Sequence, residues 1–160
     1  MRSAMWPVTW MSGVAGLLLA GAVWSPAAMA QTVASYVIVD GRTIPASLTG
    51  RAGDAEAGRK LYFDRTLTGC SGCHGSPGGP GAQPNADGQS APRLSGLASR
   101  MEVGEIRMWL IAPKLINPLT SMPGYYELGQ RKDERDPQFG GPRLTAEEIE
   151  AIVAYLARQK

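Results

Sequence analysis

The segment Cys70-Ser71-Gly72-Cys73-His74 carries the most specific chemistry of the chain. Two cysteines three positions apart fit on one helical turn, where each thiol can form a thioether to a vinyl group of haem. The histidine that follows directly can then bind the haem iron. The motif therefore predicts one covalently bound haem c, attached through Cys70 and Cys73, with His74 as the proximal iron ligand.

Other uses of two cysteines fit this sequence less well. Structural zinc normally takes four protein ligands, whereas the whole chain offers two cysteines and one histidine. A thioredoxin-like dithiol is expected near a βαβ pattern, which the sequence lacks. A plain disulfide remains an alternative, but it leaves the adjacent histidine unexplained.

The sixth iron position needs a second ligand. Because His74 is the only histidine, ligation by two histidines of this chain is excluded, and another residue, water or a partner must serve. Met101 and Met108 lie in an apolar helical stretch, where methionine usually fills the core. Met122 precedes Pro123 in an irregular segment between helices, so we expect Met122 to be the distal ligand.

The proximal histidine should donate its second ring N–H to an acceptor, which fixes its orientation. The carbonyl of Pro92, in Ala91-Pro92-Arg93-Leu94, is the candidate acceptor. Residue chemistry alone supports equally well a simple loop proline at this position.

Residues 1–30 have the pattern of an export signal that is cleaved near Ala30. They carry Arg2, an apolar stretch from residue 14 to 23, and the small-x-small sequence Ala28-Met29-Ala30. An uncleaved membrane anchor is the alternative, but an apolar core of about ten residues is short for a span. We therefore expect a periplasmic protein without stable membrane insertion after cleavage.

The charge balance gives no sign of a nucleic-acid partner. The chain has 16 Lys and Arg against 14 Asp and Glu, and loss of Arg2 leaves 15 against 14. In an oxidising compartment two free thiols would ordinarily pair, so both cysteines need an explanation that covalent haem supplies.

Beyond the signal, the sequence predicts an extended arm over residues 31–53 and one helical domain over residues 54–160. The arm holds a short β-like run, residues 36–39. Residues 76–88 are rich in glycine and proline, which predicts a surface insertion. No internal repeat or sheet-forming alternation is present, so the fold class is all-α.

Three helices are expected in that domain. Asp54 is placed to cap the first, Ser99 and Glu102 have the spacing of a capping box for a helix over 102–112, and Thr145 and Glu148 have it for the last. Glycine at position 58 and Tyr155 suggest a close crossing of the first and last helices.

These elements together resemble a class I cytochrome c over residues 54–158. A narrower resemblance is to the SoxX family, the monohaem subunits of SoxAX complexes in bacterial thiosulfate oxidation. It is carried by Ser47-Leu48-Thr49-Gly50, Gly53-Asp54-Ala55-Glu56-Ala57-Gly58-Arg59, Met122-Pro123-Gly124-Tyr125-Tyr126 and the run from Leu144 to Leu156.

The resemblance implies an electron-accepting subunit, with His74 and Met122 as axial ligands and with Pro92 as acceptor for His74. It implies a SoxA-like partner cytochrome that holds the catalytic residues, a SoxYZ-like carrier whose cysteine is joined to thiosulfate, and a downstream acceptor cytochrome. No catalytic residue is assigned to this chain. Two alternatives stay open: a free soluble electron shuttle, and a haem that binds a gas or peroxide because Met122 is not coordinated.

Overall fold

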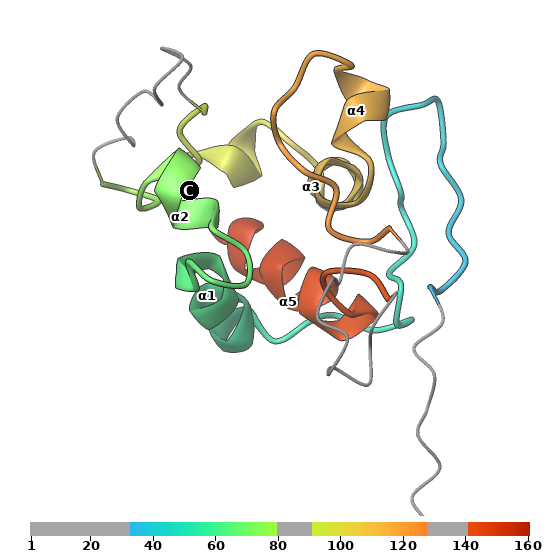
Figure 1. Ribbon diagram of the computed structural model, residues 1–160, viewed down its shortest axis with the longest axis horizontal. Helices are drawn as coiled ribbons and strands as arrows, with labels where there is room; N and C mark the ends of the chain where they lie inside the picture. Colours follow the sequence, from blue (N-terminus) through green and yellow to red (C-terminus); the bar gives the residue numbers. More distant parts are fainter. Residues whose placement is uncertain (1–32, 80–90, 128–140) are drawn as a thin grey trace, which may run out of the picture.

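The computed structural model describes residues 33–79, 91–127 and 141–160 (Figure 1). The predicted export signal lies outside the described residues, as do residues 80–88 of the predicted surface insertion. Within the described ranges, none of the helices combines the length and apolar character needed to cross a bilayer.

The described residues form short helices joined by irregular segments. The helices are α1 (Ala55–Phe63), α2 (Cys70–His74), α3 (Val103–Ile111), α4 (Pro113–Ile116) and α5 (Ala146–Leu156), with the 3₁₀ helix η1 (Leu97–Ser99) before α3. In the part of the chain described, β pairing is confined to an isolated bridge between Val39 and Thr43. The predicted all-α fold class is confirmed.

Helix α1 packs across α5, and α2 lies beside α1 (Figure 1). Asp54 caps α1 as predicted, because its carboxylate accepts hydrogen bonds from the amides of Glu56 and Ala57. A Cβ built at Gly58 would lie 1.9 Å from the carbonyl oxygen of Ala151 in α5. Glycine at this position therefore permits the close crossing that the sequence suggested.

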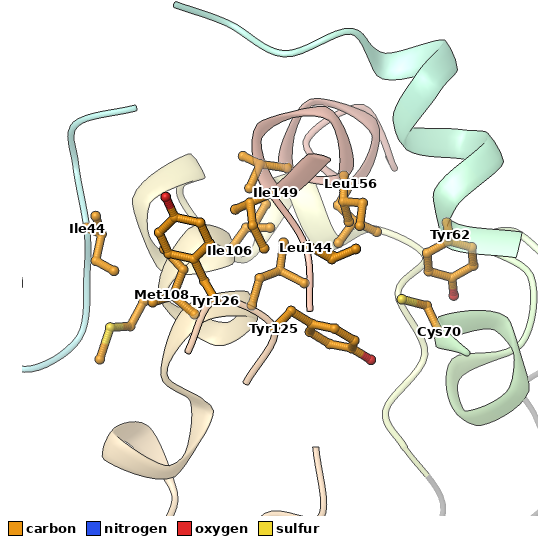
Figure 2. Close-up of a cluster of buried hydrophobic side chains, with 14 of the residues drawn as sticks. Ile44, Tyr62, Cys70, Ile106, Met108, Tyr125, Tyr126, Leu144, Ile149 and Leu156 are labelled. Carbon is orange, nitrogen blue, oxygen red and sulfur yellow. The ribbon is translucent and has the colours of Figure 1, made fainter. Parts of the chain in front are cut away.

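Helix α5 supplies one wall of the core (Figure 2). Thr145 and Glu148 form the predicted capping box, in which each side chain accepts a hydrogen bond from the backbone amide of the other residue. The apolar face of α5 is fully or almost fully buried at Ile149, Ile152, Val153 and Leu156. Tyr155 packs on Tyr62 of α1 with ring centroids 5.5 Å apart, so both helices contribute to the same contact.

Helix α3 agrees with the predicted range to within one residue at each end, but its capping residues differ from the prediction. Its capping box is formed by Glu102 and Glu105, not by Ser99 and Glu102, because Ser99 already belongs to η1. The helix ends at Ile111, and Pro113 begins the separate helix α4, where its fixed φ and missing N–H suit the first turn. Met108 is fully buried and Met101 packs against the core, which confirms their predicted role as core residues.

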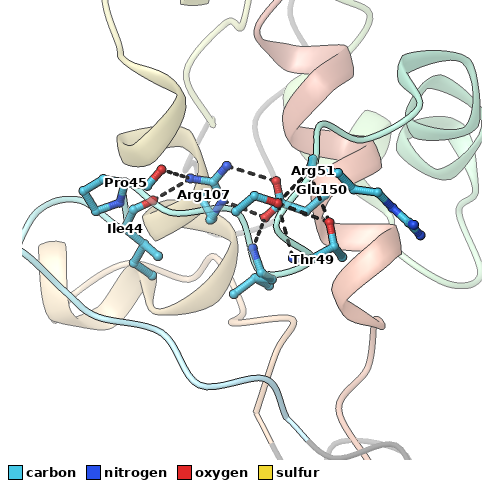
Figure 3. Close-up of polar contacts among 8 residues, drawn as sticks. Ile44, Pro45, Thr49, Arg51, Arg107 and Glu150 are labelled. Atoms are coloured by element: carbon cyan, nitrogen blue, oxygen red, sulfur yellow. Dashed lines mark hydrogen bonds and ion pairs between the residues drawn. The ribbon is translucent and has the colours of Figure 1, made fainter.

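The segment before α1 is tied to the core by a buried ion pair (Figure 3). Arg107 of α3 donates to Glu150 of α5 over 2.7 Å, and both side chains are 3% exposed. Arg107 also donates to the carbonyls of Ile44 and Pro45, while Glu150 accepts from the amide of Leu48. The arm is extended, but it is an integral part of the packed structure.

Candidate haem site

Helix α2 consists of the Cys-Ser-Gly-Cys-His motif itself. Gly69 precedes it with a φ of 67° and Gly75 follows with a φ of 70°, both in the region that favours glycine. The two glycines therefore end the helix on either side and limit it to about one and a half helical turns. Cys70 is 8% exposed and faces the core, whereas Cys73 is exposed on the same short helix.

His74 lies at the end of α2 and is held by the segment before η1. Its Nδ1 lies 2.8 Å from the carbonyl oxygen of Pro92, a residue 18 positions away. A carbonyl can only accept, so this contact requires the proton on Nδ1. The structure therefore brings together the two residues that the sequence paired, and Nε2 remains as the ring nitrogen suited to a metal.

Two buried tyrosines lie around Cys70 (Figure 2). The hydroxyl of Tyr62 donates to the carbonyl of Gly75 over 2.7 Å, and that of Tyr125 donates to the carbonyl of Thr68 over 2.8 Å. Burial raises the pKa of both phenols and also raises the pKa of the Cys70 thiol. Both tyrosines therefore stay neutral donors, and they fix the backbone on either side of α2.

Met122 lies in the irregular segment between α4 and Tyr125. It is partly buried against the core, and its amide donates to Oγ1 of Thr120 over 3.1 Å. Leu119 in the same segment is 91% exposed, an unusual position for a large apolar side chain. Leu67 and Thr68, in the segment before Cys70, accept hydrogen bonds from Arg143, which precedes α5, and from Tyr125.

Sequence reasoning did not assign roles to Tyr125 and Arg143. Arg143 donates from Nε to the carbonyl of Leu67 over 2.7 Å, and its guanidinium lies 5.5 Å from the ring centre of Tyr125. The available signal was the position of Tyr125 three residues after Met122. Its partner, 57 positions earlier in the chain, is set by tertiary structure.

The donor set fits a covalently attached haem. Two thiols on one helical turn suit the two vinyl groups, and an imidazole with Nδ1 engaged suits iron through the other nitrogen. No group of three or more His, Cys, Asp or Glu side chains suited to a metal ion occurs among the described residues. The structure therefore brings Cys70, Cys73, His74 and Pro92 together, whereas the contacts of Met122 are with Thr120 and the hydrophobic core.

Comparisons with known proteins agree with this description. The family model described as cytochrome c matches residues 55–160. Among solved structures, the crystal structure of SoxXA from P. pantotrophus matches with a TM-score of 0.61 and 30% sequence identity, covering 78% of this chain and 94% of that chain. A comparison with curated proteins gives no significant match.

The structural match includes more than the cytochrome c region. Its coverage, 78% of the chain, exceeds the two thirds spanned by residues 55–160, so the similarity continues into the segment before α1. Members of the cytochrome c family carry covalently bound haem c and transfer electrons. The chain therefore belongs to the cytochrome c family, and its likeness to the SoxXA structure identifies it as a cytochrome c of the SoxX type.

Proposed function

We propose that this protein is a periplasmic monohaem cytochrome c, attached to its haem through Cys70 and Cys73. One haem is proposed because the chain has two cysteines, both in one motif, and a single histidine. His74 would hold the iron through Nε2, and the carbonyl of Pro92 would fix the imidazole and raise its basicity. Met122 would supply the distal ligand.

Such a site is suited to electron relay. When bound, a haem with both axial positions filled exchanges one electron with little ligand rearrangement, and Met/His ligation raises its reduction potential. The surrounding chain contributes rigidity, since Tyr62 and Tyr125 hold the backbone at both ends of α2. The apolar surroundings of Cys70 exclude water from that side of the site.

We further propose that the chain is the electron-accepting subunit of a SoxAX-type complex with a SoxA-like cytochrome. The observation that carries this proposal is the likeness to the SoxXA structure at 30% identity over 94% of that chain. A downstream acceptor cytochrome would take the electrons from this subunit. The sequence between residues 1 and 30 supports delivery to the periplasm.

The reaction of such a complex joins thiosulfate to a cysteine of a SoxYZ-like carrier. The carrier thiol loses its proton, a bond forms between its sulfur and the sulfane sulfur of thiosulfate, and two electrons leave. No nucleophile paired with a histidine is assigned in this chain, so the residues that promote bond formation are expected on the partner. This subunit would accept electrons and pass them on.

The proposal is tested by affinity isolation of the chain from its native source, followed by haem staining of every protein that is isolated with it. We expect one stable second haem protein, and thiosulfate-dependent reduction of this chain's haem only when that protein and the carrier are present. Isolation as a monomer that exchanges electrons with several donors would instead support a free shuttle. A ferrous form that binds carbon monoxide without denaturation would support the gas-binding alternative.

A further inference from the structure

The side chains of Tyr125 and Arg143 donate hydrogen bonds to two consecutive backbone carbonyls, those of Thr68 and Leu67. The Tyr125 hydroxyl donates to Thr68 over 2.8 Å, and Arg143 Nε donates to Leu67 over 2.7 Å. Leu67 and Thr68 come directly before Gly69 and Cys70, the start of α2. The guanidinium of Arg143 lies over the ring of Tyr125 at 5.5 Å, so the two donors form one unit.

Tyr125 is itself held firmly by its backbone. Its amide donates to the carbonyl of Leu110 at the end of α3 over 2.9 Å, and its carbonyl accepts from the amide of Leu144 over 2.9 Å. The side chain is buried, with the residue only 4% exposed. A phenol fixed at both the backbone and the hydroxyl can transmit a positional constraint from one segment to the next.

Met122 lies three residues before Tyr125, and Cys70 lies two residues after Thr68. We propose that Tyr125 and Arg143 are positioning residues for the methionine ligand, which fix the segment that carries Met122 against the segment that carries Cys70. This inference rests on the proposed role of Met122. Neither residue is proposed to touch the haem iron.

The physical reason is that ligand exchange requires the Met122 segment to move. When an external ligand replaces the thioether, the segment is released, and contacts that depend on its position weaken. The hydrogen bond from Tyr125 to Thr68 therefore opposes exchange in the native protein. Without that bond, release of Met122 is opposed by one interaction fewer.

The next residue provides a matched control. Tyr126 is 2% exposed and lies on the same segment, but its hydroxyl accepts from the amide of Ala34 in the arm over 2.7 Å. Tyr125→Phe and Tyr126→Phe each remove one hydroxyl from a buried ring. Only the first removes a contact with the haem-attachment segment.

The test is a titration of the ferric holoprotein with imidazole. The loss of the methionine-to-iron charge-transfer absorption band reports the replacement of the methionine ligand. We expect Tyr125→Phe to raise the apparent affinity for imidazole about fivefold, the size expected for one ordinary hydrogen bond. Arg143→Lys should change it in the same direction, and Tyr126→Phe should leave it within twofold or so of the unsubstituted protein. Equal effects of Tyr125→Phe and Tyr126→Phe, or no effect of Tyr125→Phe, would overturn the inference.

Met122→Ala separates this inference from the assignment of the ligand. If Met122 is the distal ligand, the unsubstituted protein shows the band and Met122→Ala abolishes it. A band that persists in Met122→Ala, or that is absent from the unsubstituted protein, overturns both the assignment and the inference. A band that depends on Met122 but an imidazole affinity that does not depend on Tyr125 overturns the positioning role alone.

Discussion

At the scale of single residues, the least exposed phenol of the site links folding to pH. Tyr62 has no exposed surface, and burial is the main reason why its pKa lies above the ordinary value of about 10. The folded protein therefore keeps a proton that the unfolded chain releases at alkaline pH. The resulting stability is fully present below about pH 10 and is lost as the pH rises toward the folded-state pKa.

We expect the free energy of unfolding to fall by up to about 1.4 kcal/mol per pH unit above pH 10 for each such tyrosine. Tyr62→Phe should lower stability near neutral pH, because the carbonyl of Gly75 loses its donor, but should make the alkaline decline less steep. Urea unfolding of the holoprotein at neutral and alkaline pH, monitored through the fluorescence of Trp109, measures the loss of stability and its dependence on pH. An equally steep decline in Tyr62→Phe would contradict this account.

Single residues also mark the limit of sequence-based prediction. The pairing of His74 with Pro92 was one of two equal interpretations of the residues, and the resemblance to known cytochromes favoured it. Arg107 and Glu150 were not singled out, although each is a charged residue within an apolar helical face. Their pairing over 43 positions depends on how α3 and α5 meet, which no local pattern specifies.

At the scale of elements, helix starts were predictable where the capping residues act locally. Asp54 and Thr145 each bond to amides within three residues, so the sequence alone contains the interaction. The N-cap of α3 was wrongly assigned to Ser99, because Glu105 has the same three-residue spacing from Glu102, where the helix is capped. Helix α4 was not among the three predicted helices, and it begins with Pro113, whose missing N–H ends α3 but suits the first turn of a new helix.

The crossing of α1 and α5 gives a prediction for two glycines. A side chain at Gly58 would meet the α5 backbone at Ala151, so Gly58→Ala should destabilise the holoprotein by about 1–3 kcal/mol as the helices are forced apart. At Gly72 a Cβ would meet nothing within 4 Å, which makes Gly72→Ala the control. Its expected effect is neutral, or stabilising by up to about 1 kcal/mol through helix propensity.

Denaturant unfolding of both glycine variants measures the difference. If Gly58→Ala were as stable as Gly72→Ala, the two helices would have to separate without loss of packing. That result would contradict the close approach of α1 and α5 as a source of stability. Haem incorporation should be retained in Gly72→Ala, because the substitution leaves Cys70, Cys73 and His74 in place.

At the scale of the whole molecule, the arm packs against the helical domain. The sequence divided them at residue 54, and the family match likewise begins at residue 55. Ile44 of the arm is nevertheless completely buried, and its amide donates to the carbonyl of Gly104 over 3.1 Å. The boundary in sequence is therefore not a boundary in packing, because composition cannot show which core surface the arm covers.

Two deletions that leave the first 32 residues intact separate the parts of the arm. Deleting residues 33–42 removes the contact of Ala34 with Tyr126 but keeps Ile44 and the partners of the Arg107–Glu150 pair. Deleting residues 33–52 also removes the two carbonyls to which Arg107 donates and the Leu48 amide, which donates a hydrogen bond to Glu150. The buried side chains of Arg107 and Glu150 then lose their hydrogen bonds to the arm, and they also lose the arm residues that shield them from water.

We expect the shorter deletion to lower the free energy of unfolding of the holoprotein by about 2 kcal/mol, because it removes one hydrogen bond and the partly buried side chains of Val33, Ala34, Tyr36 and Ile38. The longer deletion should lower the free energy of unfolding by at least about 4 kcal/mol. It removes the buried side chain of Ile44, which exposes the core surface beneath it, and it removes hydrogen bonds to charged groups. Denaturant titrations of the two proteins measure the difference. Equal losses would mean that Arg107 and Glu150 need only each other, because a pair that is self-sufficient in the interior gains nothing from the arm that encloses it.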